Sequence, residues 1–344
     1  MQRFLVALAC FILMTMPAGA QQTVELRVQL AVPPGEKVSG ALVALVDAAN
    51  GIVSESLSGS SGGVVLRARP GDYRVRVRRI GFRPFFSQTV TIPREAQLDI
   101  RVDSPPIVLS AMVVSVRAQC GGISRDAAAL STAWEEISKA LQARQLTVRD
   151  FKGIERWSVY RREVDAGGSV VSADTTFYPA PTGRPFAAID PVSLVRDGYV
   201  RGDAVSGWDY YGPDEAVLLS RGFAETHCFR IVRDRKRQAD VGVAFAPVPR
   251  RRVADIKGVL WLDASTSELR EIEFQFVNVD LVDRFAPGGF TRFLRLPSGS
   301  WIVSEWLLRM PQIAIKSERF NTPALTGYIE SGGGVVANPE TEKR

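Results

Sequence analysis

The alternation of apolar and polar residues constrains the fold of this chain more than any other feature. Apolar side chains occupy every second position of the run 24–32. In the run 71–86, Tyr73, Val75 and Val77 alternate with arginines. A period of two places successive side chains on opposite faces of a β-strand, one dry and one wet. The chain is therefore expected to be mainly β.

Short strands of this kind follow one another through the first part of the chain. Turn signals separate them about every 8 to 12 residues without a helical period between them, a pattern typical of a β-sandwich. We expect the sandwich to span residues 22–103. Its expected strands are 24–32, 38–47, 64–68, 73–80, 89–92 and 98–102.

Two motifs give this region a family character. One is Val-Ser-Gly-Ala-Leu-Val at 38–43, and the other, within 70–84, is Pro-Gly-Asp-Tyr followed by Val-Arg-Arg-Ile-Gly-Phe-Arg-Pro. Together they resemble the carboxypeptidase regulatory-like domain, a transthyretin-like β-sandwich. The resemblance implies an accessory module without catalytic residues, of the kind found beside zinc peptidases and before TonB-dependent receptors.

The rest of the chain matches neither kind of neighbour. No peptidase follows the sandwich. The stretch 109–116 looks like the start of a receptor plug, but the remaining length cannot build a receptor barrel. The chain is more like the stand-alone bacterial envelope proteins that carry this module.

A second, α+β domain is expected at 123–329, after a connector at 104–122. It opens with helix 125–144, whose apolar residues step by three and four. We expect a disordered tail at 330–344, where glycine, asparagine, proline and charges dominate. The other expected elements are a hairpin of 154–164 and 170–178, short helices at 191–196 and 213–221, and strands at 228–232, 242–247, 258–263, 269–277, 290–296 and 301–310.

The strands of this second domain also have a family likeness. The stretch 255–263, followed by 269–274, is similar to strands of lipoprotein-carrier-like folds, and the domain is similar to the uncharacterised one that follows such modules. The resemblance implies a curved antiparallel sheet with a few helices in its concavity. A lipid or acyl ligand would then lie between helix 125–144 and the sheet.

The amino terminus predicts export. Residues 1–20 combine one positive charge, an apolar core and a small-residue cleavage site, as a secretory signal peptide does. No later segment is apolar enough to span a membrane as a helix. We expect a periplasmic or outer-membrane-associated protein of a Gram-negative bacterium.

Two cysteines, Cys120 and Cys228, lie beyond the signal. In an oxidising compartment such a pair favours a disulfide bond over two buried thiols. The bridge is therefore predicted, with the two thiols as the alternative.

Residues suited to catalysis are scarce. His227 is the single histidine, so a zinc site of several histidines cannot be assembled. A Ser-His-Asp triad would need His227 as its base, and we expect no strand-to-helix elbow that could hold the nucleophilic serine. Glu271 and Glu273 would share one face of a strand at the spacing of a glycosidase pair, but any half-exposed strand shows that spacing. The sequence predicts that the protein is not an enzyme and has no metal or cofactor.

The formal net charge is +6, and basic residues gather at 76–83, 233–237 and 250–252. Such runs can touch anionic lipid or polysaccharide, but solvated strand faces and loops are favoured. Export argues against nucleic acid as a partner.

Aromatic side chains are the candidates for ligand binding. They could line an apolar groove for an acyl chain or stack on sugars, although a core that covers the sheet is favoured. The candidate ligand-binding residues are Trp157, Tyr160, Trp261, Phe274, Phe276, Trp301 and Trp306.

The leading hypothesis is an exported, non-catalytic envelope protein that acts as a binding or assembly module. Its partners would be outer-membrane or other envelope proteins, or an apolar or glycan ligand. The alternative is a periplasmic carrier of a lipid or another apolar ligand in the second domain. An envelope glycan hydrolase is the third hypothesis.

Overall fold

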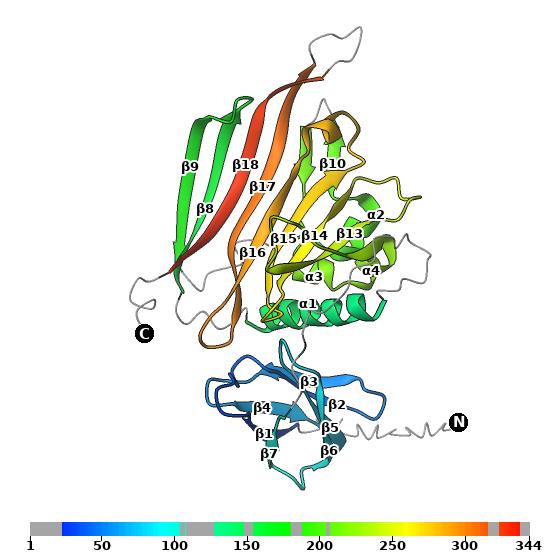
Figure 1. The fold of residues 1–344 in the computed structure, drawn as a ribbon, viewed down its shortest axis with the longest axis vertical. Helices are drawn as coiled ribbons and strands as arrows, with labels where there is room; N and C mark the ends of the chain where they lie inside the picture. The colour runs from blue at the N-terminus through cyan, green and yellow to red at the C-terminus, as the bar shows by residue number, and fades with distance from the viewer. Residues whose placement is uncertain are drawn as a thin grey trace, which may run out of the picture.

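The computed structural model places two domains one above the other (Figure 1). The N-terminal sandwich is drawn in blue and cyan, and the larger domain lies beyond helix α1 (Ala127–Thr147). The structure describes residues 23–103, 107, 127–147, 154–179, 188–203, 207–315 and 323–337.

Seven strands form the predicted β-sandwich. One sheet has the order β4-β1-β7 and the other the order β3-β2-β5-β6. Their inward side chains, among them Leu26, Leu45 and Val75, make a buried core. The strands are β1 (Val24–Ala31), β2 (Leu42–Val46), β3 (Ile52–Leu57), β4 (Gly63–Ala68), β5 (Gly71–Arg78), β6 (Phe85–Ile92) and β7 (Gln97–Arg101).

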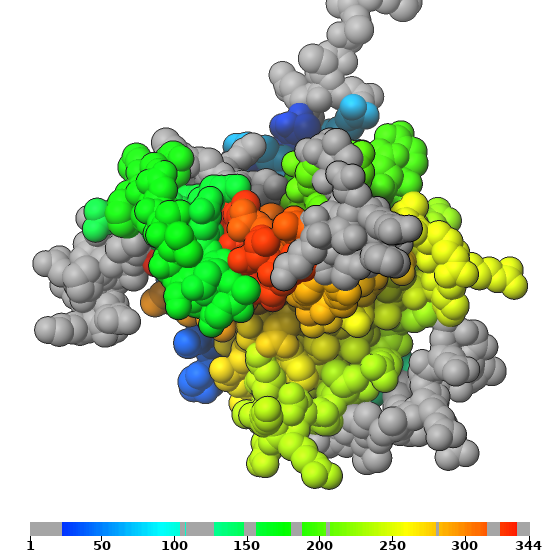
Figure 2. Space-filling model, turned by 90° about the horizontal axis from the view of Figure 1, so that it is seen from above, coloured from blue at the N-terminus to red at the C-terminus, as the bar shows by residue number. Residues whose placement is uncertain are grey.

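The second domain is built on one nine-stranded antiparallel sheet. Its order is β12-β13-β14-β15-β16-β17-β18-β8-β9, so a meander of seven strands is extended by the hairpin β8–β9. From the end, that hairpin stands in green beside the orange and red of β17 and β18 (Figure 2). The strands are β8 (Ile154–Asp165), β9 (Val170–Pro179), β12 (His227–Val232), β13 (Asp240–Pro247), β14 (Asp255–Asp263), β15 (Leu269–Val277), β16 (Gly288–Arg295), β17 (Trp301–Ile315) and β18 (Pro323–Ala337).

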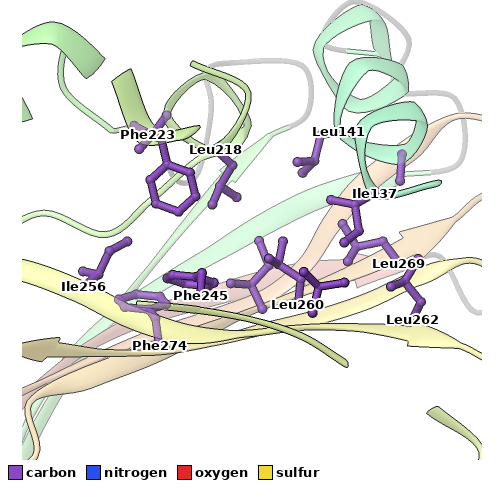
Figure 3. Close-up of a cluster of buried hydrophobic side chains, with 14 of the residues drawn as sticks. Ile137, Leu141, Leu218, Phe223, Phe245, Ile256, Leu260, Leu262, Leu269 and Phe274 are labelled. Atoms are coloured by element: carbon purple, nitrogen blue, oxygen red, sulfur yellow. The ribbon is translucent and has the colours of Figure 1, made fainter. Parts of the chain in front are cut away.

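Helices cover one face of this sheet. Ile137 points from α1 toward Leu269 of the sheet, and Leu141 points into the space between Leu218 and Leu260 (Figure 3). All of these side chains are almost fully buried. The space between α1 and the sheet is thus filled, and the expectation of a ligand there is wrong. The other elements on this side are α2 (Pro191–Asp197), α3 (Glu215–Leu218), α4 (Arg221–Thr226), the hairpin β10 (Val200–Asp203) with β11 (Gly207–Tyr210), and a 3-10 turn at Asp280–Phe285.

The sandwich joins the second domain through the loop after β5. Lys139 of α1 is fully buried, and its Nζ donates to the carbonyl oxygens of Arg79 at 3.0 Å and Phe82 at 2.8 Å. It also pairs with Glu136 at 2.6 Å, and Glu136 accepts a 2.8 Å hydrogen bond from the backbone N–H of Gly81. The motif that marks the sandwich family is therefore also its attachment to α1.

A second contact between the domains is made by backbone. Gly40 has a φ of +72°, and a Cβ there would collide with the carbonyl of Gly299 in the β16–β17 turn. Beside it, Arg295 donates to the carbonyl oxygen of Ser39 at 2.8 Å. Leu42 of the sandwich belongs to the same buried cluster as the core of the second domain. The two domains therefore share a continuous interior.

The basic run 76–83 was expected to lie on a solvated strand face, but two of its arginines are buried. Arg78 and Arg79 are each only 6% exposed. Arg78 donates to Glu55 of β3 at 3.1 Å and to Gln142 of α1, and Arg79 pairs with Glu36 at 2.6 Å. These arginines lie at the junction because acidic and amide groups of both domains surround them.

The expected disordered tail is wrong for residues 330–337. They complete β18, which pairs with β17 on one side and β8 on the other. Buried Glu330 accepts from Arg162 at 2.6 Å. The glycine-rich composition of this segment led to the prediction of a tail. In the sheet, the glycines instead leave room for side chains of the neighbouring strands, as Gly332 does for Tyr160.

One expected helix and two other elements also differ from the prediction. The expected helix at 213–221 is two short helices, α3 and α4, with the hydroxyl of Ser220 capping the second. Strand β3 and the hairpin β10–β11 were not predicted. In β3 the exposed Ile52 and Val53 hide the period of two, and the hairpin strands have only four residues each.

Several expectations fall outside the described residues. They concern the signal peptide at 1–20, almost all of the connector at 104–122, and Cys120. The disulfide between Cys120 and Cys228 therefore stays a prediction, with Cys228 placed on β12.

Candidate functional site

The sheet has one face that no helix covers. On β14, Ile256, Leu260 and Leu262 are fully buried in the core beneath the helices. Because side chains alternate along a strand, Lys257 and Val259 point the other way. We call that other side the open face.

A groove of about 1090 Å³ lies on the open face. That volume is in the range of small-molecule sites in proteins. Strands β12 to β17 and the segments that connect them supply the lining, which is Cys228, Phe229, Arg230, Arg237, Ala244, Phe245, Ala246, Pro247, Pro249, Lys257, Gly258, Val259, Glu271, Glu273, Phe274, Gln275, Ala286, Gly288, Gly289, Phe290, Arg292, Leu307 and Arg309.

The strand registers place one mostly apolar row across this face. Each member is the direct partner of the next on the neighbouring strand. Since neighbouring strands lie about 4.8 Å apart, the five steps from β12 to β17 span about 24 Å. The row, called here the apolar row, is Arg230, Ala244, Val259, Glu273, Phe290, Leu307, Gly332 and Tyr160.

Two charged rows run beside the apolar row. On one side the registers align Lys257, Gln275, Gly288, Arg309, Glu330 and Arg162. On the other side they align Trp261, Glu271, Arg292 and Glu305. The groove therefore has a largely apolar central row with a charged row on each side.

Arginines neutralise most of the carboxylates in these rows. Arg237 donates to Glu271 at 3.0 Å and to Glu273, and its guanidinium lies 5.0 Å from the ring of Trp261. The indole N–H of Trp261 donates to Glu273 at 3.1 Å. Arg292 continues the network to Glu305. Glu273, the one acid in the apolar row, is thus held by Arg237 and Trp261.

Two cations of the groove stand apart from this network. Arg230 on β12 and Lys257 on β14 are both exposed. Among the residues that the structure describes, neither forms an ion pair. They lie at the β12 end of the groove, with only β13 between their strands. This end can accept an anionic group without breaking an existing salt bridge.

The predicted aromatic residues are divided between the open face and the cores. Tyr160 ends the apolar row, and Trp261, which is also buried, contacts the groove residues Arg237 and Glu273. Phe274 contributes to the lining but is 4% exposed. The others are buried, as expected for a core: Trp157, Phe276, Trp301 and Trp306.

His227 has a structural environment. It is buried, stacks on Phe223 at 4.1 Å between ring centroids, and its Nε2 lies 3.1 Å from both Asp255 Oδ1 and the carbonyl oxygen of Ile256. Cys228, its neighbour on β12, points to the other face of the sheet, so the two side chains do not form a catalytic pair. Over the described ranges, no three acidic, histidine or cysteine side chains gather as metal ligands do.

Of the residues that line the groove, only Phe274 was predicted to bind a ligand, and Glu271 and Glu273 were considered as a carboxylate pair. Arg230, Lys257 and Phe290 each sit in a strand where alternation was visible in the sequence. The alternation identified the two faces of each strand, but only the strand pairing shows which residues of different strands share a row. From the sequence, Arg230 and Lys257 could have been recognised only as basic residues of their strands and not as neighbours in one site.

The fold joins a β-sandwich to an antiparallel-sheet domain that has one open face. Residues 23–103 match the carboxypeptidase regulatory-like domain, which confirms the resemblance for the sandwich. The match ends there, so the likeness of the second domain to lipoprotein carriers receives no support from it. None of the curated proteins compared with the chain matches it. In the described part of the chain, no helix has the length and apolarity to cross a membrane.

Proposed function

We propose that this is an exported, non-catalytic binding protein of the cell envelope, and that the open-face groove is its binding site. The ligand class is an amphiphile with an anionic head and an apolar chain. The observation that supports it is the apolar row, which leads away from Arg230 and Lys257, two groove cations that have no acidic partner among the described residues. The sandwich serves as the accessory module that its family match suggests.

The physical argument has two parts. Val259, Phe290 and Leu307 offer apolar contact across three strands, and burying apolar area contributes about 25 cal/mol per Å². Arg230 and Lys257 at the end of that surface would form charge-assisted hydrogen bonds to a carboxylate or phosphate. The combination favours an amphiphile over a purely polar anion.

The same residues count against the hydrolase hypothesis. A glycosidase pair needs one carboxyl group that is protonated and able to donate. The guanidinium of Arg237 donates to both Glu271 and Glu273, so it lies between the two carboxyl groups, where a scissile glycosidic bond would have to be. The arrangement therefore favours binding over acid–base chemistry.

Calorimetric titration with dodecanoate, with dodecan-1-ol as the neutral counterpart, tests the proposal. Dodecanoate should bind, and the alcohol should bind about tenfold more weakly, since the head group contributes about 1.4 kcal/mol. The double variant R230Q/K257Q should remove that difference. The matched control R94Q/R101Q removes two exposed arginines of the sandwich and should leave both affinities unchanged. If the wild-type protein binds neither compound, or if R230Q/K257Q binds both as the wild type does, the proposal is wrong.

A further inference from the structure

A second cleft lies on the opposite, helix-side face of the sheet. The hairpin β10–β11 stands over β17 and β18, and about 800 Å³ of space remains between them. The helices do not fill this part of the face. The cleft is lined by Arg161, Gly207, Trp208, Asp209, Tyr210, Tyr211, Leu308, Met310, Pro311, Gln312, Ile313, Thr326, Ile329 and Ser331.

Three aromatic residues follow one another closely along one wall. Trp208, Tyr210 and Tyr211 come from β11 and the residue after it, and each is partly exposed. Packing fixes two of them: Tyr210 meets Phe276 edge to face at 5.2 Å, and the guanidinium of Arg201 lies 5.3 Å from the ring of Tyr211. Contacts with Phe276 and Arg201 therefore fix two of the three rings of this aromatic wall.

The facing wall combines apolar side chains of β17 and β18 with the polar side chains of Arg161, Gln312, Thr326 and Ser331, and the charges around the whole cleft balance. Arg161 reaches the cleft from β8, Gln312 from β17, and Asp209 from the aromatic side. Arg161 and Asp209 are exposed, and neither forms an ion pair within the described residues. One positive and one negative group thus balance, in contrast to the cationic end of the open-face groove.

One polar group at the cleft lacks a partner. The Tyr210 hydroxyl is buried and has no hydrogen bond in the described part of the chain. Burial, aided by Asp283, raises the pKa of Tyr210 to about 12, so the hydroxyl keeps its proton. An unmade hydrogen bond in a buried place costs free energy, so a ligand that opens the wall beside the Tyr210 hydroxyl would recover it.

From these observations we propose that the cleft binds a neutral carbohydrate chain. The flat apolar face of a sugar ring suits the aromatic wall, because Trp and Tyr offer large rigid surfaces with a polar tip. The arginine, amide and carboxylate side chains supply the donors and acceptors that sugar hydroxyls require. An acyl chain would leave those polar groups unsatisfied, and an anionic glycan would meet Asp209 as well as Arg161.

The probes are three neutral hexasaccharides: maltohexaose, cellohexaose and the β-1,4 hexamer of N-acetylglucosamine. Calorimetric titration of the whole chain should detect binding of at least one. Trp208→Ala should weaken that binding about tenfold or more, a loss of about 1.4 kcal/mol. Asp209→Ala, which alters only an exposed side chain, should weaken it several-fold even if Trp208→Ala fails to fold.

Two controls separate this site from the open-face groove. Phe177→Ala removes an aromatic ring that is 53% exposed on β9, outside the cleft, and should leave the affinity unchanged. R230Q/K257Q should also leave it unchanged, so this proposal and the proposed function can fail separately. Absence of binding to all three hexasaccharides, or equal binding by wild type, Trp208→Ala and Asp209→Ala, would overturn the proposal.

Discussion

The two faces of the nine-stranded sheet use the same strands for different purposes. On the helix side, alternate residues such as Leu260, Ile272 and Phe276 are almost fully buried. On the open face, the residues between them form one apolar row flanked by arginine and glutamate. One face therefore stabilises the domain, and the other is available to a ligand.

The difference between the two faces indicates that ligand specificity can change through substitutions on the open face without loss of the fold. A substitution on the helix side leaves a cavity in a close-packed interior. A substitution on the open face changes charge or shape at a surface that is already hydrated. We therefore expect the largest stability effects on one face and the largest binding effects on the other.

The largest stability difference should separate two neighbouring residues of β14. Leu260→Ala should lower the free energy of unfolding by about 2 to 5 kcal/mol, because it empties space in the core. Val259→Ala, one residue earlier on the open face, should cost about 1 kcal/mol. Urea titration followed by circular dichroism measures both. Equal losses in the free energy of unfolding would contradict the claim that the helix-side face stabilises the domain more than the open face does.

The helix that covers the inner face should depend on its buried ion pair. Lys139→Met leaves Glu136 buried without its partner, and breaking such a pair costs about 3 to 5 kcal/mol. Burial, opposed by Lys139, already raises the pKa of Glu136. The double variant K139M/E136L should recover part of the loss, and urea titration compares the two. A single variant as stable as the wild type would contradict the role given to this pair.

A smaller effect is expected from pH at the end of β14. Burial alone would raise the pKa of Asp263, but hydrogen bonds from the Ser265 hydroxyl, from Arg270 and from the backbone N–H groups of Thr266 and Ser265 lower it well below its usual range. A carboxylate whose pKa is lower in the folded than in the unfolded state stabilises the fold at pH values above the unfolded-state pKa of about 3.9. That stabilisation is lost as the pH falls below about 3.9 toward the pKa of the folded state. Thermal melting points between pH 6 and pH 2 measure the loss.

Asp263→Asn provides the comparison for this pH effect. It should be less stable than the wild type at pH 6, and the difference should shrink as the solution is acidified. A difference that stays constant with pH would show that the carboxylate of Asp263 contributes nothing through its charge.

The sequence predicted the strands better than it predicted what joins them. The period of two in β1 and β5 shows the inward and outward residues directly, and the family motif fixed the sandwich. In contrast, the buried places of Lys139 and Arg78 depend on contacts between domains far apart in the sequence. Composition also misled at Glu330, where a glycine-rich segment is an inner strand and not a tail.

The same limit applies to the candidate site. Trp301 and Trp306 were candidates because they are aromatic, but aromatic residues serve cores and ligand sites equally well. The apolar row exists only once seven strand pairings have set the register. Trp208 and its hairpin were missed because strands of four residues carry too little periodicity to be seen.

The most direct test of the open face as the ligand surface is a chemical-shift map of the backbone amides on addition of dodecanoate. The account predicts that the largest changes occur at Arg230, Lys257, Val259 and Phe290, whereas Leu141 and Leu218 beneath the helices change little. The largest changes among residues between α1 and the sheet, or none in β12 to β17, would contradict it.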